Sequence, residues 1–94
     1  MDRNAAVLAE QVASFPASPP HLEDLHAALD RFWAHAKRAL PRPPGNEWQI
    51  AFTTAVVEIA TNVMRHAYAA EAHPRPMELR LRAYSDALEA EFLD

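Results

Sequence analysis

Eight prolines limit what this chain of 94 residues can fold into, because they gather in three clusters. The clusters span residues 16–20, 41–44 and 74–76. A proline inside a helix removes a backbone hydrogen bond and clashes with the preceding turn, and a proline in a central strand interrupts the ladder. The chain is therefore expected to form four pieces of one or two elements each, without internal repeats.

The first piece, residues 5–15, carries two conflicting signals. Val7, Ala9, Ala13 and Phe15 are spaced as the residues on one side of a strand are. The Ala, Leu, Glu and Gln content of the same piece favours a helix. We interpret this piece as a strand.

The second piece has the signals of a helix that begins at Ser18 and ends near Leu40. Ser18 offers an N-cap, Pro19 and Pro20 fit a first turn, and Asp24 is an acidic residue favoured near a helix start. Five apolar residues recur at helical spacing: Leu22, Leu25, Leu29, Phe32 and Ala36. These signals predict an amphipathic helix with one buried side.

The third piece predicts a long helix after a stiff loop at residues 41–45. Asn46 offers an N-cap, and the helix is expected to run to about Ala70, before the prolines at 74 and 76. At about 100° per residue, eight apolar residues cover roughly half of its circumference and are expected to be buried. They are Trp48, Phe52, Val56, Val57, Ile59, Ala60, Val63 and Met64.

The last piece changes to the period of a strand. Apolar and polar residues alternate in residues 77–84 and again in residues 87–94, with Ser85 and Asp86 between them. This pattern predicts a hairpin of two half-buried strands. The expected order is β-α-α-β-β, which is an α+β fold in which helices cover one face of an antiparallel or mixed sheet as a two-layer sandwich.

Composition limits the class of protein further. A chain of this length forms a single domain, residues 1–94, and its net charge of −4 argues against a surface that binds nucleic acid. The absence of cysteine excludes disulfides and thiolate metal sites. No signal peptide and no apolar stretch of about 18 residues is recognised, so we expect a cytoplasmic protein that does not enter a membrane.

The predicted third-piece helix has a polar side that needs an explanation. Thr54, Glu58, Thr61, Asn62 and Arg65 lie opposite its apolar residues. A solvated face accounts for such a side in most amphipathic helices. Here, however, threonine and asparagine are poor helix formers, and a face kept only for solvent would more often carry Lys, Glu or Gln.

The chemistry of this polar side suits a magnesium-nucleotide site. Mg²⁺ prefers oxygen ligands and keeps several waters and the phosphates, so one amide oxygen from Asn62 can suffice as a protein ligand. Glu58, one turn earlier, could orient or deprotonate an attacking hydroxyl. Arg65 could meet phosphate charge.

The pattern E-x-x-x-N-x-x-x-H-A-Y, filled by Glu58, Asn62, His66, Ala67 and Tyr68, resembles the N-box of the GHKL ATPases, which have the Bergerat fold. Within that family it is most similar to the anti-sigma-factor serine kinases of bacteria. The expected order of elements agrees with the resemblance, which covers nearly the whole chain, with the N-box at residues 56–68. It implies a histidine-kinase-like ATPase domain that binds Mg-ATP.

The resemblance also implies roles for individual residues. Asn62 matches the asparagine that binds Mg²⁺, and Glu58 matches the acidic residue that activates the attacking water or serine hydroxyl. Arg65 and His66 match positions that often lie near the phosphates. Asp94 falls where the next motif of the family, D-x-G-x-G, begins, and its aspartate recognises the adenine amino group.

The glycine-rich motifs of the family are missing from the sequence, whose only glycine is Gly45. We therefore expect the chain to correspond to the N-terminal portion of such a domain, an incomplete Bergerat fold. Backbone N–H groups in glycine-rich loops provide most of a phosphate-binding cradle. Weak or no binding of ATP is the expectation for this chain alone, together with dimerisation or marginal stability.

Two hypotheses of function remain open from the sequence. The resemblance implies a regulatory protein serine kinase that phosphorylates an anti-anti-sigma protein of the STAS type. Such a kinase also acts as an anti-sigma factor by binding a sigma factor, and it forms a homodimer. The same module within a larger signalling protein is a related possibility. The alternative is a non-catalytic interaction module that does not bind ATP. Trp33, next to the buried Phe32, is the expected contact residue for a dimer or a sigma factor.

Overall fold

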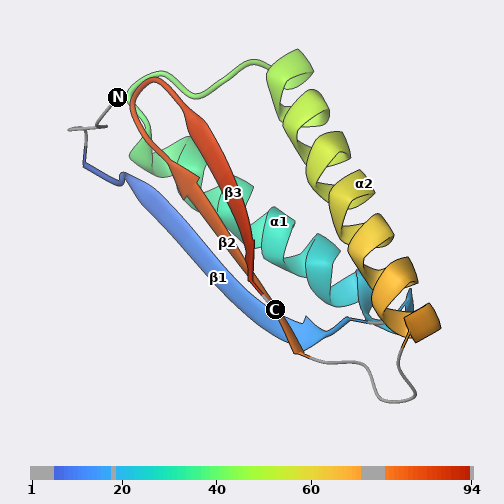
Figure 1. Cartoon of the computed structure of the whole chain (residues 1–94). Helices are drawn as coiled ribbons and strands as arrows, with labels where there is room; N and C mark the ends of the chain where they lie inside the picture. Colours follow the sequence, from blue (N-terminus) through green and yellow to red (C-terminus); the bar gives the residue numbers. More distant parts are fainter. Residues whose placement is uncertain (1–5, 18, 71–75, 94) are drawn as a thin grey trace.

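The computed structural model describes residues 6–17, 19–70 and 76–93 and has the predicted order β-α-α-β-β (Figure 1). Its elements are the strand β1 (Ala9–Pro16), a 3-10 turn η1 (Pro19–His21), the helices α1 (Leu22–Ala39) and α2 (Asn46–Ala70), and the strands β2 (Pro76–Ala83) and β3 (Leu88–Leu93). The conflicting signals of the first piece are resolved in favour of a strand. The expected α+β class is confirmed.

The sheet has the order β1-β2-β3, and both pairs of neighbouring strands are antiparallel. In the centre of the register, Leu81 of β2 lies opposite Gln11 of β1 and Ala90 of β3. The β2-β3 hairpin turns at Ser85 and Asp86, as predicted. Of the two sheet types that the sequence allowed, the described strands form the antiparallel one.

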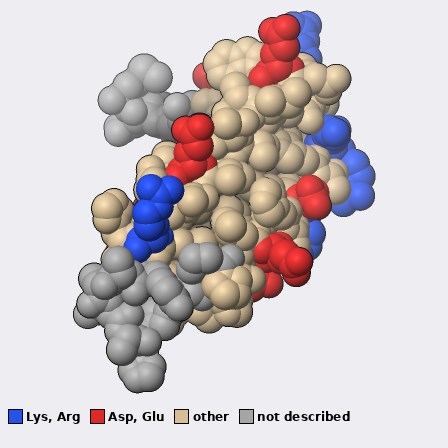
Figure 2. Space-filling view, turned by 90° about the vertical axis from the view of Figure 1, so that its right-hand side faces the viewer, with Lys and Arg blue, Asp and Glu red and all other residues tan. Residues whose placement is uncertain are grey.

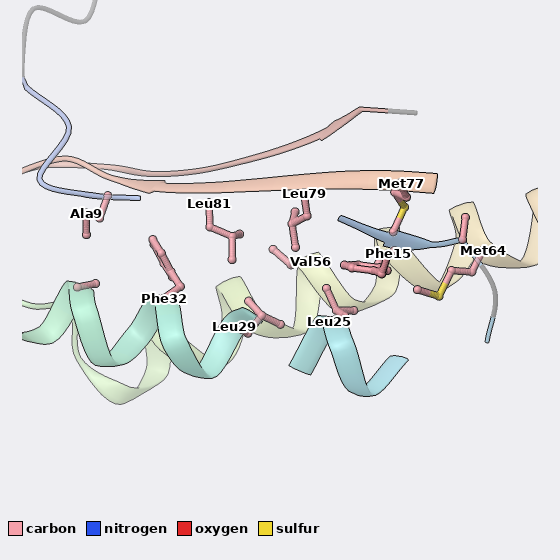
Figure 3. Packing of buried hydrophobic residues seen from close by; sticks show 14 of the residues in the cluster. Ala9, Phe15, Leu25, Leu29, Phe32, Val56, Met64, Met77, Leu79 and Leu81 are labelled. Carbon is pink, nitrogen blue, oxygen red and sulfur yellow. The ribbon is translucent and has the colours of Figure 1, made fainter. Parts of the chain in front are cut away.

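Both helices pack on the same face of this sheet (Figures 1 and 3). The side chains of β2 alternate between the two faces of the sheet. Four of them face the helices and are fully buried: Met77, Leu79, Leu81 and Ala83. In Figure 3, Leu79 and Leu81 extend from the sheet toward side chains of α1 that include Phe32. Burial of this apolar surface is the main contribution to the stability of the fold.

α1 follows its sequence pattern closely. Leu25, Leu29, Phe32 and Ala36 are buried against the sheet, whereas Leu22 is only partly buried. The expected first turn is different, because Pro19 and Pro20 form the 3-10 turn and α1 begins two residues after them. His21 takes the N-cap position without a side-chain capping bond; the predicted cap, Ser18, lies outside the described residues.

α2 buries a narrower surface than its sequence predicts. Val56, Ala60 and Met64 form its buried row, and Phe52 is partly buried. Val57 and Val63 are also partly buried. Trp48 and Ile59 were expected in the core, but their exposed fractions are 69% and 50%. The reason is geometric: the three described strands lie beneath one side of α2, and the flank with Trp48 and Ile59 is only partly covered.

The two helices contact each other through aromatic side chains. The ring of Phe52 on α2 lies 5.9 Å from that of Trp33 and 6.2 Å from that of Phe32, both on α1. The indole Nε1 of Trp33 donates a hydrogen bond of 2.9 Å to Oγ1 of Thr53. Trp33 is partly buried, so it is a packing residue between the helices as well as a partly accessible one.

The outer face of the sheet is held by charged side chains. Nε of Arg82 donates to Glu10 at 2.7 Å, and its Nη1 donates to Glu89 at 3.0 Å and lies 3.7 Å from Glu91. The hydrogen bonds to Glu10 and Glu89 raise the pKa of Arg82 above its ordinary value. One arginine thus bridges all three strands. Neither helix in the described part of the chain is both long and apolar enough to cross a membrane.

Candidate functional site

The buried row of α2 determines where its polar side points. Because Val56, Ala60 and Met64 face the sheet, residues about half a turn away face outward. Glu58 and Asn62 are both exposed on that outward side, one helical turn apart. The structure therefore brings these two predicted site residues together on one accessible surface.

Arg65 and His66 are also exposed on α2, one turn beyond Asn62. Over seven residues, or about 10 Å of helix, the outward surface presents a carboxylate, an amide and a guanidinium in that order. Glu58 and Asn62 have no side-chain hydrogen bond to another described residue. The three groups are thus available to a ligand.

Thr61 differs from the other residues predicted on the polar side. Its side chain is partly buried, and its hydroxyl donates a hydrogen bond of 2.7 Å to the backbone carbonyl of Val57. Such bonds to the preceding turn satisfy the hydroxyl of a helical threonine without any ligand. Thr61 therefore needs no ligand, whereas Thr54 is exposed on the polar side.

The site fits the metal part of Mg-ATP better than the phosphate part. The amide oxygen of Asn62 can act as a single protein ligand to Mg²⁺, and within the described part of the chain no three His, Cys, Asp or Glu side chains gather at any alternative metal site. Gly45, the only glycine, has no positive φ, and none of the described residues forms a left-handed turn of the kind that builds an anion-binding nest. The N-terminus of α2 lies about 24 Å from Asn62 along the helix, too far to contribute its dipole.

One predicted site residue cannot be placed in the same way. Asp94, the expected adenine-recognising residue, lies outside the described residues. β3, the last described element, ends at Leu93.

The sequence did not predict a second accessible feature, a cavity of about 350 Å³ where α2 begins. Trp48 and Phe52 line it from α2, Arg42 from the preceding loop, and Leu88 from the start of β3. Its lining residues on α2 lie about 15–21 Å from Asn62 along the helix, so it is separate from the candidate magnesium site. The available signal is Trp48 in the first turn of a helix that follows a rigid proline loop, whereas helical spacing predicts this side chain in the core.

Comparisons with protein-family models, with curated proteins and with solved structures found no match to this chain. The functional interpretation therefore depends on the residues of α2 and on their placement.

Proposed function

We infer that the chain carries the magnesium-binding half of a nucleotide site, in an ATP-dependent regulatory module of the GHKL type. The observation that supports this proposal is the placement of Glu58 and Asn62, which α2 holds on one exposed surface, one turn apart and without partners among the described residues. A fixed helix is a suitable support for such groups, since sites on regular elements are held more rigidly than sites on loops.

Each residue has a role that its chemistry allows. The amide oxygen of Asn62 coordinates Mg²⁺, which bound ATP would also coordinate through its phosphate oxygens. The carboxylate of Glu58 accepts the proton of an attacking hydroxyl, as a positioned general base does. Arg65 offsets negative charge at the phosphates. His66 lies at the border of the same surface and contributes to phosphate contact.

The wider function proposed is that of a cytoplasmic serine kinase and anti-sigma factor. The residue pattern that resembles the N-box of these kinases supports it, and so does the order of the elements. In this function the module phosphorylates a serine of an anti-anti-sigma protein of the STAS type, binds a sigma factor and acts as a homodimer.

A non-catalytic interaction module is the second candidate. The observation that favours it is the exposed apolar flank of α2, where Trp48 and Ile59 have exposed fractions of 69% and 50%. Apolar patches of this kind commonly mark protein-protein contacts. The lack of a phosphate-binding nest among the described residues points in the same direction.

An NMR titration of the chain with ATP and Mg²⁺ distinguishes the two candidates. The nucleotide-site proposal predicts magnesium-dependent chemical-shift changes centred on residues 58–66, with weak affinity because the described residues form no phosphate cradle. Asn62→Ala should abolish the magnesium dependence. Glu47→Gln, another exposed residue of α2, should leave it unchanged.

Shift changes that persist in Asn62→Ala, or that are absent at all ATP concentrations, would favour the interaction module. Isothermal titration provides a separate check on the expected weakness. A micromolar affinity for Mg-ATP would contradict the argument that the phosphate cradle is missing.

A further inference from the structure

The outer edge of β3 is unpaired in the described part of the sheet, because β3 pairs with β2 alone. Unpaired backbone N–H and C=O groups at a sheet edge can accept another extended chain. We propose that the free edge of β3 binds an extended segment of a partner protein, in which apolar residues alternate with Lys or Arg, as a fourth antiparallel strand. This surface is distinct from the Glu58 and Asn62 site.

The first support comes from the burial of paired residues in β2 and β3. Leu79 and Leu81 of β2 are fully buried, whereas Phe92 and Ala90, their partners in β3, are only partly buried. The same difference separates Ala83 from its partner Leu88. Since β2 covers one side of β3, the remaining exposure lies on the side of the free edge. A fourth strand would cover it.

At the opposite edge of the sheet, on β1, the apolar side chains that face the helices are buried more completely. On β1, Ala9 and Phe15 face the helices with exposed fractions of 2% and 4%, and Ala13 between them is partly buried. α1 packs closely on β1, so the apolar side of that edge is largely covered already. The exposed apolar rim is therefore a property of β3.

The neighbouring flank of α2 supplies the second part of an apolar surface. Trp48 and Ile59 are exposed on α2, and Trp48 lines the same cavity as Leu88 of β3. Figure 2 views the molecule from the side of α2 and shows a middle region formed mainly by uncharged residues, with acidic and basic residues toward its borders. Apolar side chains of an added strand would face this flank of α2. The cavity of about 350 Å³ could take one large side chain of that strand.

The third support is the charge on the outer face of β3. Glu89 and Glu91 lie on this face, and their nearest cation, Arg82, is shared with Glu10. Arg80, opposite Glu91 in the register, is paired with Glu78 at 3.5 Å. Two arginines thus face four carboxylates and neutralise them incompletely. Lys or Arg residues of an added strand, placed opposite these glutamates, would therefore stabilise the strand pair.

The same charges argue against a second copy of this chain as the occupant. Antiparallel pairing of two β3 strands with their apolar sides together would place Glu89 and Glu91 of one copy opposite those of the other. Like charges directly opposite each other destabilise a strand pair. The favoured occupant is thus a basic segment from another protein.

The test is a titration of the isotope-labelled chain with a nine-residue synthetic peptide that alternates Lys and Val. Binding should shift the amide signals of residues 88–93 and of Ile59 while leaving those of β1 in place. A peptide that alternates Glu and Val should bind at least roughly tenfold more weakly, because its charges repel Glu89 and Glu91. Equal binding of the two peptides would overturn the proposal.

A second experiment distinguishes strand pairing from nonspecific electrostatic binding of a basic peptide. N-methylation of alternate residues of the Lys-Val peptide, on the side that pairs with β3, removes its backbone donors and should abolish the shifts at residues 88–93. Unchanged shifts would contradict strand addition.

Variants of the chain test the charge argument. Glu89→Gln combined with Glu91→Gln should weaken binding of the Lys-Val peptide roughly three- to tenfold, whereas Glu23→Gln on α1 should have no effect. Equal affinity in the double variant would overturn the charge requirement. Concentration-dependent shifts of residues 88–93 in the free chain, together with a dimer in light scattering, would show that a second copy is the occupant instead.

Discussion

The two helices lie on the same face of one sheet, yet they use it differently. α1 has six charged residues in 18 and buries Leu25, Leu29 and Phe32 completely or nearly so. α2 has three charged residues in 25 and buries mainly the row of Val56, Ala60 and Met64. α1 resembles an ordinary amphipathic helix, whereas α2 exposes both apolar and uncharged polar side chains.

The two helices are therefore under different sequence constraints. A helix that serves only the fold divides into a buried apolar side and a charged solvent side, as α1 does. α2 retains asparagine and threonine where better helix formers would be expected, and it leaves Trp48 and Ile59 exposed. The two proposed sites, with Glu58 and Asn62 on the outward side and the flank near β3, would account for these departures.

The largest effect is expected from the buried side of α1. Phe32→Ala removes a fully buried ring that contacts both Trp33 and Phe52, so the unfolding free energy should fall by about 3–5 kcal/mol. Urea denaturation followed by circular dichroism measures it. Ile50→Ala, with an exposed fraction of 66%, is the control and should cost less than about 0.5 kcal/mol. Similar losses in both variants would contradict the assigned core.

A smaller effect is expected from the buried row of α2. Met64→Ala should cost about 2 kcal/mol, at the low end for such a change, because α2 packs less closely on the sheet than α1. Ile59→Ala is the matched control on the exposed flank and should be nearly neutral. If Ile59→Ala proved as costly as Met64→Ala, the flank of α2 would be covered rather than free.

The contact between the helices gives the third prediction. Trp33→Phe removes the donor to Oγ1 of Thr53 and should cost about 1 kcal/mol. A double-mutant cycle with Thr53→Ala isolates the hydrogen bond, with an expected coupling of about 0.5–1.5 kcal/mol. A coupling near zero would mean that the helices are joined by ring packing alone.

The smallest effect has the opposite sign. Thr54→Ala on the outward side of α2 should stabilise the chain by about 0.5 kcal/mol, since alanine is the better helix former and Thr54 is exposed. A thermal melt compared with the wild type detects this change. A loss of stability would show that Thr54 has a structural role.

Much of the fold could be predicted from the sequence because its signals are local. The proline clusters marked the boundaries of the elements, and alternation in residues 77–84 and 87–94 identified the hairpin. Four of the five apolar positions predicted for the buried side of α1 are buried, and the exception is Leu22 at its first residue. The antiparallel sheet type could not be decided, because it depends on how β1 pairs with β2 across the 59 residues between them.

The burial of α2 was predicted less well, and Trp48 and Ile59 show why. Helical spacing identifies which residues are apolar and which share a side, but it does not give the width of the surface available to cover them. The three described strands cover only part of the apolar surface of α2. The exposure of Glu58 and Asn62 followed correctly from spacing, whereas the cavity beside Trp48 required the hairpin to be placed next to the start of α2.

The most direct test of the proposed role of α2 replaces Mg²⁺ with paramagnetic Mn²⁺ in the presence of ATP. If Asn62 is a metal ligand, amide signals within a turn of residue 62 should broaden first, and Asn62→Ala should remove this broadening without loss of stability. Broadening that is unchanged in Asn62→Ala, or that centres on another part of the chain, would contradict a metal-binding role for α2.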